Sequence, residues 1–156
     1  MMRRNEIDAR DRAILRALQD NARLTNAELA QRVSLSPSAC LRRLRALEES
    51  GIIRQYALLL DEAACGKPGT AFVHIALDKQ SRAALDAFEE AAAHVPEIMD
   101  CYLIAGSTDY LMRVLYSDAA DIERIHSEIL TRLPGVQRVQ STLTLRAVKR
   151  TTAIEI

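Results

Sequence analysis

The sequence predicts an α+β protein built from two parts, and three observations support this prediction. Residues 7–50 carry three segments of helical hydrophobic period, each preceded by a capping residue. From residue 70 onward, strand and helix periods alternate in the order β-α-β-β-α-β. Between them, residues 61–69 gather glycine, proline and small polar residues, a composition typical of a linker. We therefore expect domains at residues 1–60 and 70–156, joined by a linker at 61–69.

The first two helices are predicted from apolar spacing and from their caps. Apolar residues recur at helical spacing behind Asp8, which predicts a helix over residues 8–20. Thr25 followed three positions later by Glu28 is a capping-box pattern, in which two free backbone N–H groups are satisfied reciprocally. A second helix is therefore expected over residues 26–33.

Ser36 and Pro37 predict the start of a third helix, because serine is favoured at the N-cap and proline is tolerated at the first helical position. Gly51 supplies the stop, so this helix is expected over residues 37–50. One face of this helix is apolar and predicted to be buried, with Cys40, Leu41, Leu44 and Leu47. The opposite face is basic and carries short side chains near the start of the helix.

The segment that follows, residues 52–60, is rich in β-branched, aromatic and aliphatic side chains, which favours a strand that acts as a wing and a connector. Three short helices, a tight turn before the third, and a strand indicate a winged helix-turn-helix whose third helix lies in the DNA major groove. On pattern alone, a plain three-helix bundle with solvated arginines stays open as the alternative.

The start of the third helix supplies the expected DNA contacts, since a helix N-terminus carries free N–H donors that suit phosphate. We expect Ser38 and Arg42 to reach base edges. Phosphate contacts are expected mainly from Arg43, Arg45 and Arg54. The same DNA-binding surface is expected to include Thr25, Asn26, Ser36 and Ala39.

The second part reads as a ferredoxin-like βαββαβ domain, with two helices against one face of a four-stranded antiparallel sheet. Its strands are expected at residues 70–77, 98–105, 110–116 and 136–148, and its helices at 81–94 and 119–133. A tight turn, Gly106 to Asp109, joins the middle strands. Glycine and aspartate are frequent in turns for backbone reasons, so a plain β-hairpin is as good an interpretation of this turn as a binding site.

Composition narrows the class of function. The net charge is zero, with +3 in residues 1–61, where every basic residue is arginine, and −3 in residues 62–156. No apolar run approaches the roughly 20 residues needed to cross a bilayer, and the charged start of the chain does not resemble a signal peptide. We expect a cytoplasmic protein with no membrane contact. A DNA-packaging architectural protein remains an alternative, although it would need a more basic chain.

Catalysis, metal binding and cofactor binding are not expected. The three cysteines, Cys40, Cys65 and Cys101, are far apart and never paired as C-x-x-C, so each is interpreted as a small apolar filler. The histidines share no metal-ligand spacing. No nucleophile and base constellation and no phosphate loop is present, which disfavours an enzyme, although the ferredoxin-like fold also hosts enzymes.

Several motifs together resemble one known family of bacterial and archaeal regulators. They are the segment LSPSACLRRL at residues 35–44, the GII at 51–53, the AGSTDY at 105–110 and the LPGV at 133–136. This combination is similar to that of the leucine-responsive regulatory protein and asparagine-operon regulator (Lrp/AsnC, feast/famine) family. The resemblance covers nearly the whole chain.

This resemblance implies that the second part senses an amino acid and forms dimers that assemble further, often to octamers. It further implies an effector pocket between subunits, lined by Gly106, Ser107, Thr108 and Asp109 of one chain and by Gln140, Ser141 and Thr142 of a neighbour. Many relatives carry an acidic and then an aromatic residue after the glycine, where this chain has serine and threonine. The tail over residues 149–154 resembles one found in a subset of the family, in which proline often stands at the position of Glu155.

A regulator of this kind would present two recognition helices from a two-fold dimer to adjacent half-sites, so the operator is expected to be an imperfect palindrome of double-stranded DNA. The effector would shift the equilibrium between assemblies that space those helices differently.

Overall fold

A computed structural model describes residues 7–156, which form two compact units. The charged start that argued against a signal peptide lies largely outside these residues. The first unit comprises the described residues up to Leu58 together with Lys149–Ile156, and the second comprises Leu59–Val148. The last eight residues, expected in the second domain, pack instead with the first unit, because side chains of its first helix bind their backbone.

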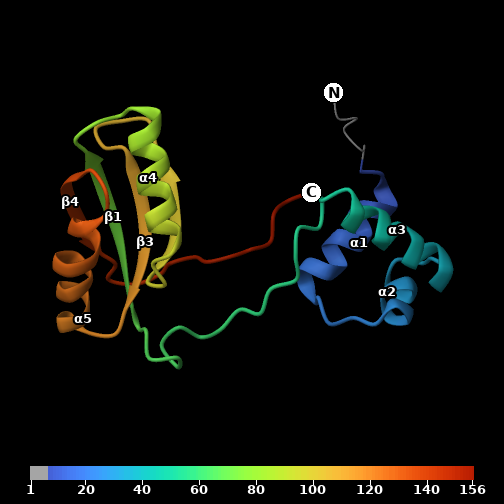
Figure 1. The fold of residues 1–156 in the computed structure, drawn as a ribbon. Helices are drawn as coiled ribbons and strands as arrows, with labels where there is room; N and C mark the ends of the chain where they lie inside the picture. Colours follow the sequence, from blue (N-terminus) through green and yellow to red (C-terminus); the bar gives the residue numbers. More distant parts are fainter. Residues whose placement is uncertain (1–6) are drawn as a thin grey trace. The chain divides into compact units, whose positions relative to one another are not determined.

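Three helices form the first unit, as predicted: α1 (Ala9–Asp20), α2 (Asn26–Arg32) and α3 (Pro37–Glu49) (Figure 1). Each has its predicted cap, and the Asp8 and Thr25 caps are both complete capping boxes. Leu41, expected on the buried face of α3, is exposed, because it lies at the edge of that face. The helices enclose an apolar core that includes Ile14, Leu29, Cys40 and Leu47.

The turn between α2 and α3 depends on one unusual backbone conformation. Ser34 has a φ of 54°, in the left-handed region that non-glycine residues rarely adopt. The backbone N–H of Ser34 donates to Gln31, and that of Leu35 donates to Ala30, which closes the end of α2. The chain thereby turns sharply enough for α3 to start at Pro37.

The strand expected at residues 52–60 is absent: this segment has no regular secondary structure. Its β-favouring side chains cannot form a strand by themselves, because strand hydrogen bonds need a partner strand and the described chain offers none to it. The apolar side chains near its end face solvent instead, with Leu58 84%, Leu59 69% and Leu60 64% exposed, whereas Ile52 and Ile53 pack against the core of the first unit.

The second unit has the predicted order of elements and a four-stranded antiparallel sheet of strand order β2-β3-β1-β4. Figure 1 displays the two helical segments packed beside this sheet. The last strand is shorter than predicted, and the second long helix changes after one and a half turns to a π turn (Ile125–Ile129) and a 3-10 turn (Leu130–Arg132). The elements are β1 (Gly69–Leu77), α4 (Arg82–Ala93), β2 (Ile98–Leu103), β3 (Tyr110–Tyr116), α5 (Ala119–Arg124) and β4 (Val136–Leu143).

Both helices cover the same face of the sheet. Alternate residues of β1, including Val73 and Ile75, are fully buried in one core with Phe88 of α4 and Ile125, the residue that follows α5. The intervening positions point to the other face, where no element of the second unit covers them, and Phe72 remains 41% exposed. The unit therefore has two layers and one open sheet face.

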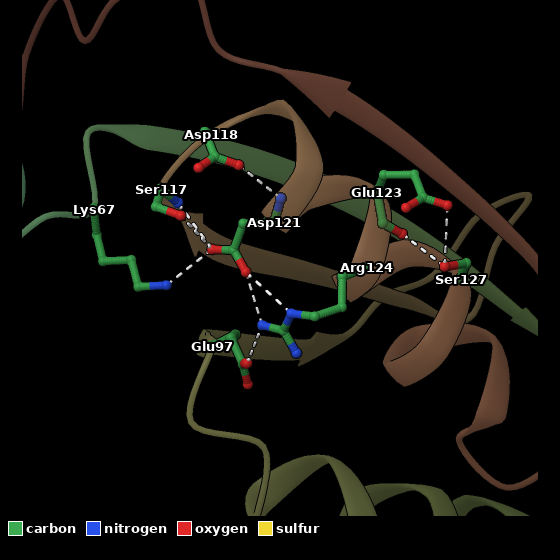
Figure 2. Close-up of polar contacts among 8 residues, drawn as sticks. All are labelled: Lys67, Glu97, Ser117, Asp118, Asp121, Glu123, Arg124 and Ser127. Atoms are coloured by element: carbon green, nitrogen blue, oxygen red, sulfur yellow. Dashed lines mark hydrogen bonds and ion pairs between the residues drawn. The ribbon is translucent and has the colours of Figure 1, made fainter.

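The expected linker is fixed to the second unit by ion pairs. Lys67 Nζ lies 2.9 Å from a carboxylate oxygen of Asp121, which also accepts hydrogen bonds from Ser117 (Figure 2). Arg124 joins Asp121 to Glu97 on the other side of this network. These contacts hold the pKa of Asp121 well below its ordinary value, with the Lys67 hydrogen bond as the largest cause. Residue 67 therefore belongs to the rigid second unit.

Candidate functional site

The start of α3 is an exposed surface whose backbone is set by a cap. Ser36 accepts a hydrogen bond from the backbone N–H of Ala39 at 3.3 Å, and its hydroxyl lies 3.3 Å from that of Ser38. Ser38 and Arg42 are both exposed, and Ala39 is half-buried. Ser38 and Arg42 lie four residues apart, about one helical turn, so both project from the same side of α3.

Thr25 and Asn26, at the start of α2, help to position α3, the helix expected to read DNA. The Thr25 hydroxyl donates to Glu28 at 2.8 Å, and the backbone N–H of Thr25 donates to the same carboxylate oxygen at 2.7 Å. These bonds lower the pKa of Glu28. Asn26 Nδ2 donates to the carbonyl of Pro37 at 2.9 Å, which fixes the start of α2 against the start of α3. The predicted pair of DNA-binding residues therefore has a structural task within this unit.

Arg43 has a partner that the sequence analysis did not foresee. Its guanidinium donates to Asp8 at 2.8 Å and to Asp11 at 2.9 Å, the two residues of the α1 capping box. The Asp11 hydrogen bond is the largest cause of a raised pKa at Arg43. The side chain is 30% exposed and fastens α3 to α1, so it is less free to reach a phosphate than its neighbours.

Arg42, Arg45 and Arg54 are all exposed. Among residues 7–156, none of the three makes an ion pair or a side-chain hydrogen bond. Each therefore offers free donors and a positive charge, which is what binding to a phosphate backbone requires.

A hollow of about 550 Å³ lies at one end of the sheet in the second unit. It contains three of the four predicted turn residues, Gly106, Ser107 and Asp109. Of these, Gly106 and Ser107 are exposed. Space is open above Gly106, where an added Cβ would meet no atom within 4 Å. Residues that the sequence analysis did not select complete the lining: Ala76, Leu77, Gln80, Gln137 and Arg138.

The Asp109 side chain stabilises the structure around this hollow and has little surface left to contact a ligand. Its carboxylate accepts from the backbone N–H of Leu77 at 2.7 Å and from Gln80 Nε2 at 2.6 Å. Its own backbone N–H donates to Ile75 at 2.8 Å. Since the side chain is only 9% exposed, these bonds tie the turn to the end of β1 and leave the backbone of residues 106–107 at the rim.

Thr108 and Gln140 lie on either side of one histidine on the open sheet face. Thr108 is buried with its hydroxyl 3.3 Å from His74 Nδ1, while the Cα of Gln140 pairs with that of His74 in the sheet register. Thr142 follows on the same face, opposite Phe72. These residues are therefore grouped on the open sheet face within one chain. They neighbour Ser107, Asp109 and Arg138 of the hollow but do not themselves line it.

Ser141 points to the opposite face from its neighbours, because side chains alternate along a strand. It pairs with the buried Val73 in the sheet register, and its hydroxyl lies 3.1 Å from His126 Nδ1 in the π turn. The three predicted residues of β4 therefore do not form one surface within this chain.

The cysteines are all free thiols. Cys40 is buried, as an apolar filler should be, but Cys65 and Cys101 are exposed, so that interpretation is wrong for them. Within residues 7–156, no group of three or more His, Cys, Asp or Glu side chains could hold a metal ion. None of the helices over the same residues is long and apolar enough to cross a membrane.

The two units match two family models. Residues 7–54 match the model of a winged helix-turn-helix DNA-binding domain. Residues 70–154 match the model of the Lrp/AsnC ligand binding domain.

Relatives and solved structures agree with these matches over the full chain. A leucine-responsive regulatory protein of Rhizobium meliloti is 41% identical over 156 residues, all of both chains. The crystal structure of a transcriptional regulator from Neisseria meningitidis in complex with L-Met has a TM-score of 0.90 and 38% identity, and covers 95% of this chain and 96% of that one. A feast or famine regulatory protein from M. tuberculosis, complexed with L-methionine, has a TM-score of 0.83 and 31% identity over 95% of this chain and 98% of that one.

Proposed function

The chain belongs to the Lrp/AsnC family of transcriptional regulators, and we propose that it reads operator DNA with α3 and responds to an amino acid bound at the hollow of its second unit. Membership of a family of regulators makes it a DNA-binding regulator and not an enzyme. Because its partner is DNA, we place its action in the cytoplasm.

Base reading is assigned to Ser38 and Arg42, and phosphate binding to Arg45 and Arg54. Exposed arginines without recorded partners can donate to guanine or phosphate at no cost in broken ion pairs. Arg43 and Asn26 take the role of holding α3 in place, because Arg43 Nη1 already donates to Asp8 and Asp11, and Asn26 Nδ2 donates to Pro37.

The lining of the hollow supports an amino acid as the effector. A free amino acid needs a cation for its carboxylate and oxygen acceptors for its ammonium. Arg138 supplies the cation, while the backbone of Gly106 and Ser107 and the amides of Gln80 and Gln137 supply polar partners. Ser107 occupies the position where many relatives have an acidic residue, which could pair with the effector's ammonium group. In this chain, main-chain oxygens would accept the ammonium hydrogen bonds instead. Two similar regulators of known structure bind L-methionine, which makes it the first compound to try.

The open sheet face and the exposed leucines support a homodimer. Phe72 and Tyr102, 41% and 58% exposed, lie on the uncovered face, and Leu58 to Leu60 follow the first unit without a cover. Large apolar side chains that are exposed on an uncovered sheet face, or in an uncovered segment, are typical of interfaces between protein chains. A second copy would bury them and present two α3 helices to a palindromic operator, and further assembly to an octamer would place an effector between dimers.

The observation that carries this proposal is the hollow lined by Gly106, Ser107 and Arg138. It occurs in a chain whose other unit has exposed arginines on α3 that are unpaired within residues 7–156. We would test it by a thermal-shift screen against the twenty amino acids, since a ligand that binds only the folded state stabilises it by about 2.7 kcal/mol at 100 times its Kd. Arg138→Ala should abolish the shift, whereas Arg146→Ala, an exposed arginine outside the hollow, should keep it.

Three results would contradict the proposal. They are a chain that no amino acid stabilises, an Arg138→Ala variant that keeps the full shift, and a strictly monomeric chain at micromolar concentration in light scattering.

A further inference from the structure

The last eight residues of the chain bind the outer side of α1. Gln19 contacts the backbone of Ile154 with both ends of its amide: Nε2 donates to the Ile154 main-chain oxygen at 3.1 Å, and Oε1 accepts from its N–H at 2.6 Å. One turn earlier on the same helix, Arg16 donates to the main-chain oxygen of Ile156. The tail, defined as Lys149–Ile156, is therefore held at three points by two side chains.

An apolar contact completes this attachment. Ile156 packs against the core of the first unit, the cluster that contains Ile14 and Leu15 of α1. Ile154, in contrast, is 70% exposed, so Gln19 recognises its backbone and not its side chain. A paired amide contact of this kind imitates the two hydrogen bonds that one β-strand residue exchanges with its neighbour.

The tail also follows closely after β4, the strand that contributes Arg138 to the hollow. Arg138 of the hollow lies in β4, which ends at Leu143, and only residues 144–148 separate that strand from the tail. Five residues span at most about 18 Å when fully extended. The connection between β4 and the tail is therefore short, and a large displacement of β4 would pull on the tail.

The other connection between the units has its attachment on the second unit. Lys67 is fixed to Asp121 and Glu62 to Arg113, at 2.9 and 3.2 Å (Figure 2 for the first). One covalent connection is thus held at its second-unit end by ion pairs, and the other is held at its first-unit end by Gln19 and Arg16. Two connections restrict the relative freedom of the units more than one.

We propose that the tail is a latch that transmits effector binding at the hollow to α1 and hence to the reading helix. The latch has two discrete states, docked on Gln19 and released, which is the kind of element that allosteric coupling requires. This inference rests on the proposed sensing function, since without an effector the latch has no signal to carry.

The test uses the full chain, a chain that ends after Val148, and the Gln19→Ala variant. Gln31→Ala is the matched control: it removes an exposed glutamine from a helix of the same unit, and no hydrogen bond from that side chain is recorded within residues 7–156. Hydrogen exchange at the Ile154 N–H measures docking. Fluorescence anisotropy with operator DNA, with and without L-methionine and L-leucine, measures coupling.

We expect a protected Ile154 N–H in the full chain and in Gln31→Ala, and fast exchange in Gln19→Ala. Allosteric couplings typically change affinity by about 5- to 150-fold, and we expect the amino acid to change the DNA affinity of the full chain within this range. In the truncated and Gln19→Ala chains, the DNA affinities with and without the amino acid should differ by less than about twofold.

Fast exchange at Ile154 in the full chain, or full coupling after truncation, would overturn the latch while leaving the sensing function intact. A full chain whose DNA affinity responds to neither probe, in a protein that no amino acid stabilises, would overturn the sensing function and the transmission together.

Discussion

The two units place their candidate sites in opposite ways. In the first, most of the candidate site is an exposed helix face contributed by one short stretch of sequence, Ser36 to Arg45, with Arg54 added from the segment that follows. In the second, it is a hollow assembled from the ends of three strands that lie far apart in the chain, near residues 76–80, 106–109 and 137–138. A helix surface needs only its caps and its packing to be correct, whereas a hollow needs the register of a whole sheet.

This difference separates the roles of charged residues as well. In the first unit the free arginines face outward, and one arginine, Arg43, is used to hold the helix. In the second, the acid of the turn, Asp109, is used to hold the hollow, and a cation from another strand faces the space. In each unit, therefore, one charged residue that was expected to bind a ligand serves as a support: Arg43 in the first and Asp109 in the second.

The largest effect is expected where the hollow depends on Asp109. Asp109→Ala removes an acceptor from Leu77 N–H and from Gln80, and hydrogen bonds to a charged group contribute about 1.5–3 kcal/mol each. We expect the free energy of unfolding to fall by about 3 kcal/mol, measured by urea denaturation with circular dichroism. Asp109→Asn keeps one acceptor and should lose less. Equal midpoints for Asp109→Ala and the unchanged chain would mean that the turn does not hold the hollow.

The comparison is sharpened next by Arg42. If Arg42 reads a base, Arg42→Ala should weaken operator binding by about 1–3 kcal/mol, roughly 5- to 150-fold, and should relax the sequence preference. Arg45→Ala should weaken operator and unrelated DNA alike, because phosphate contacts carry no sequence information. Anisotropy titrations against an operator selected from random DNA measure both. The same loss on both DNAs for Arg42→Ala would move this residue to the phosphate class.

A matched pair of serines separates folding from reading within one helical turn. Ser36→Ala removes the N-cap bond of α3 and should lower stability by about 1 kcal/mol. Ser38→Ala removes no cap, so its stability should stay within about 0.5 kcal/mol while its operator preference declines. Thermal unfolding and DNA titration of both variants give the result. A destabilised Ser38→Ala with unchanged DNA preference would reverse the two assignments.

The smallest effect concerns acid pH. The pKa of Asp121 lies below its ordinary value of 3.8 in the folded state, so its ionised form stabilises the fold above about pH 4, and this contribution is lost as pH falls through the folded pKa. Asp121→Asn should therefore be less stable at neutral pH and lose less on acidification. Glu123→Gln, on the same helix, is the control. Parallel stability curves for Asp121→Asn and the unchanged chain between about pH 5 and 2 would contradict the assignment.

Much of the local structure follows from residues that act over a few positions. Asp8, Thr25 and Ser36 were each predicted as caps and are caps, because capping is decided by the backbone groups within three residues. The order of strands and helices in the second unit was also predicted, since it depends on hydrophobic period alone. The family resemblance, which rests on several such motifs together, is confirmed by the comparisons.

What only the tertiary structure decided is which residues meet. The register of β4 against β1 brings Arg138 to Ala76 at the hollow and turns Ser141 away from Gln140, and a register cannot be read from the period of a single strand. Residues 52–60 had the composition of a strand but no partner strand among residues 7–156. Arg43 and the C-terminal tail found their partners on α1 across large distances in sequence, and those choices are made by packing and long-range hydrogen bonds. The sequence by itself therefore determined most of the helices and strands, α3 among them, while the hollow and the tail contact depend on three-dimensional pairing.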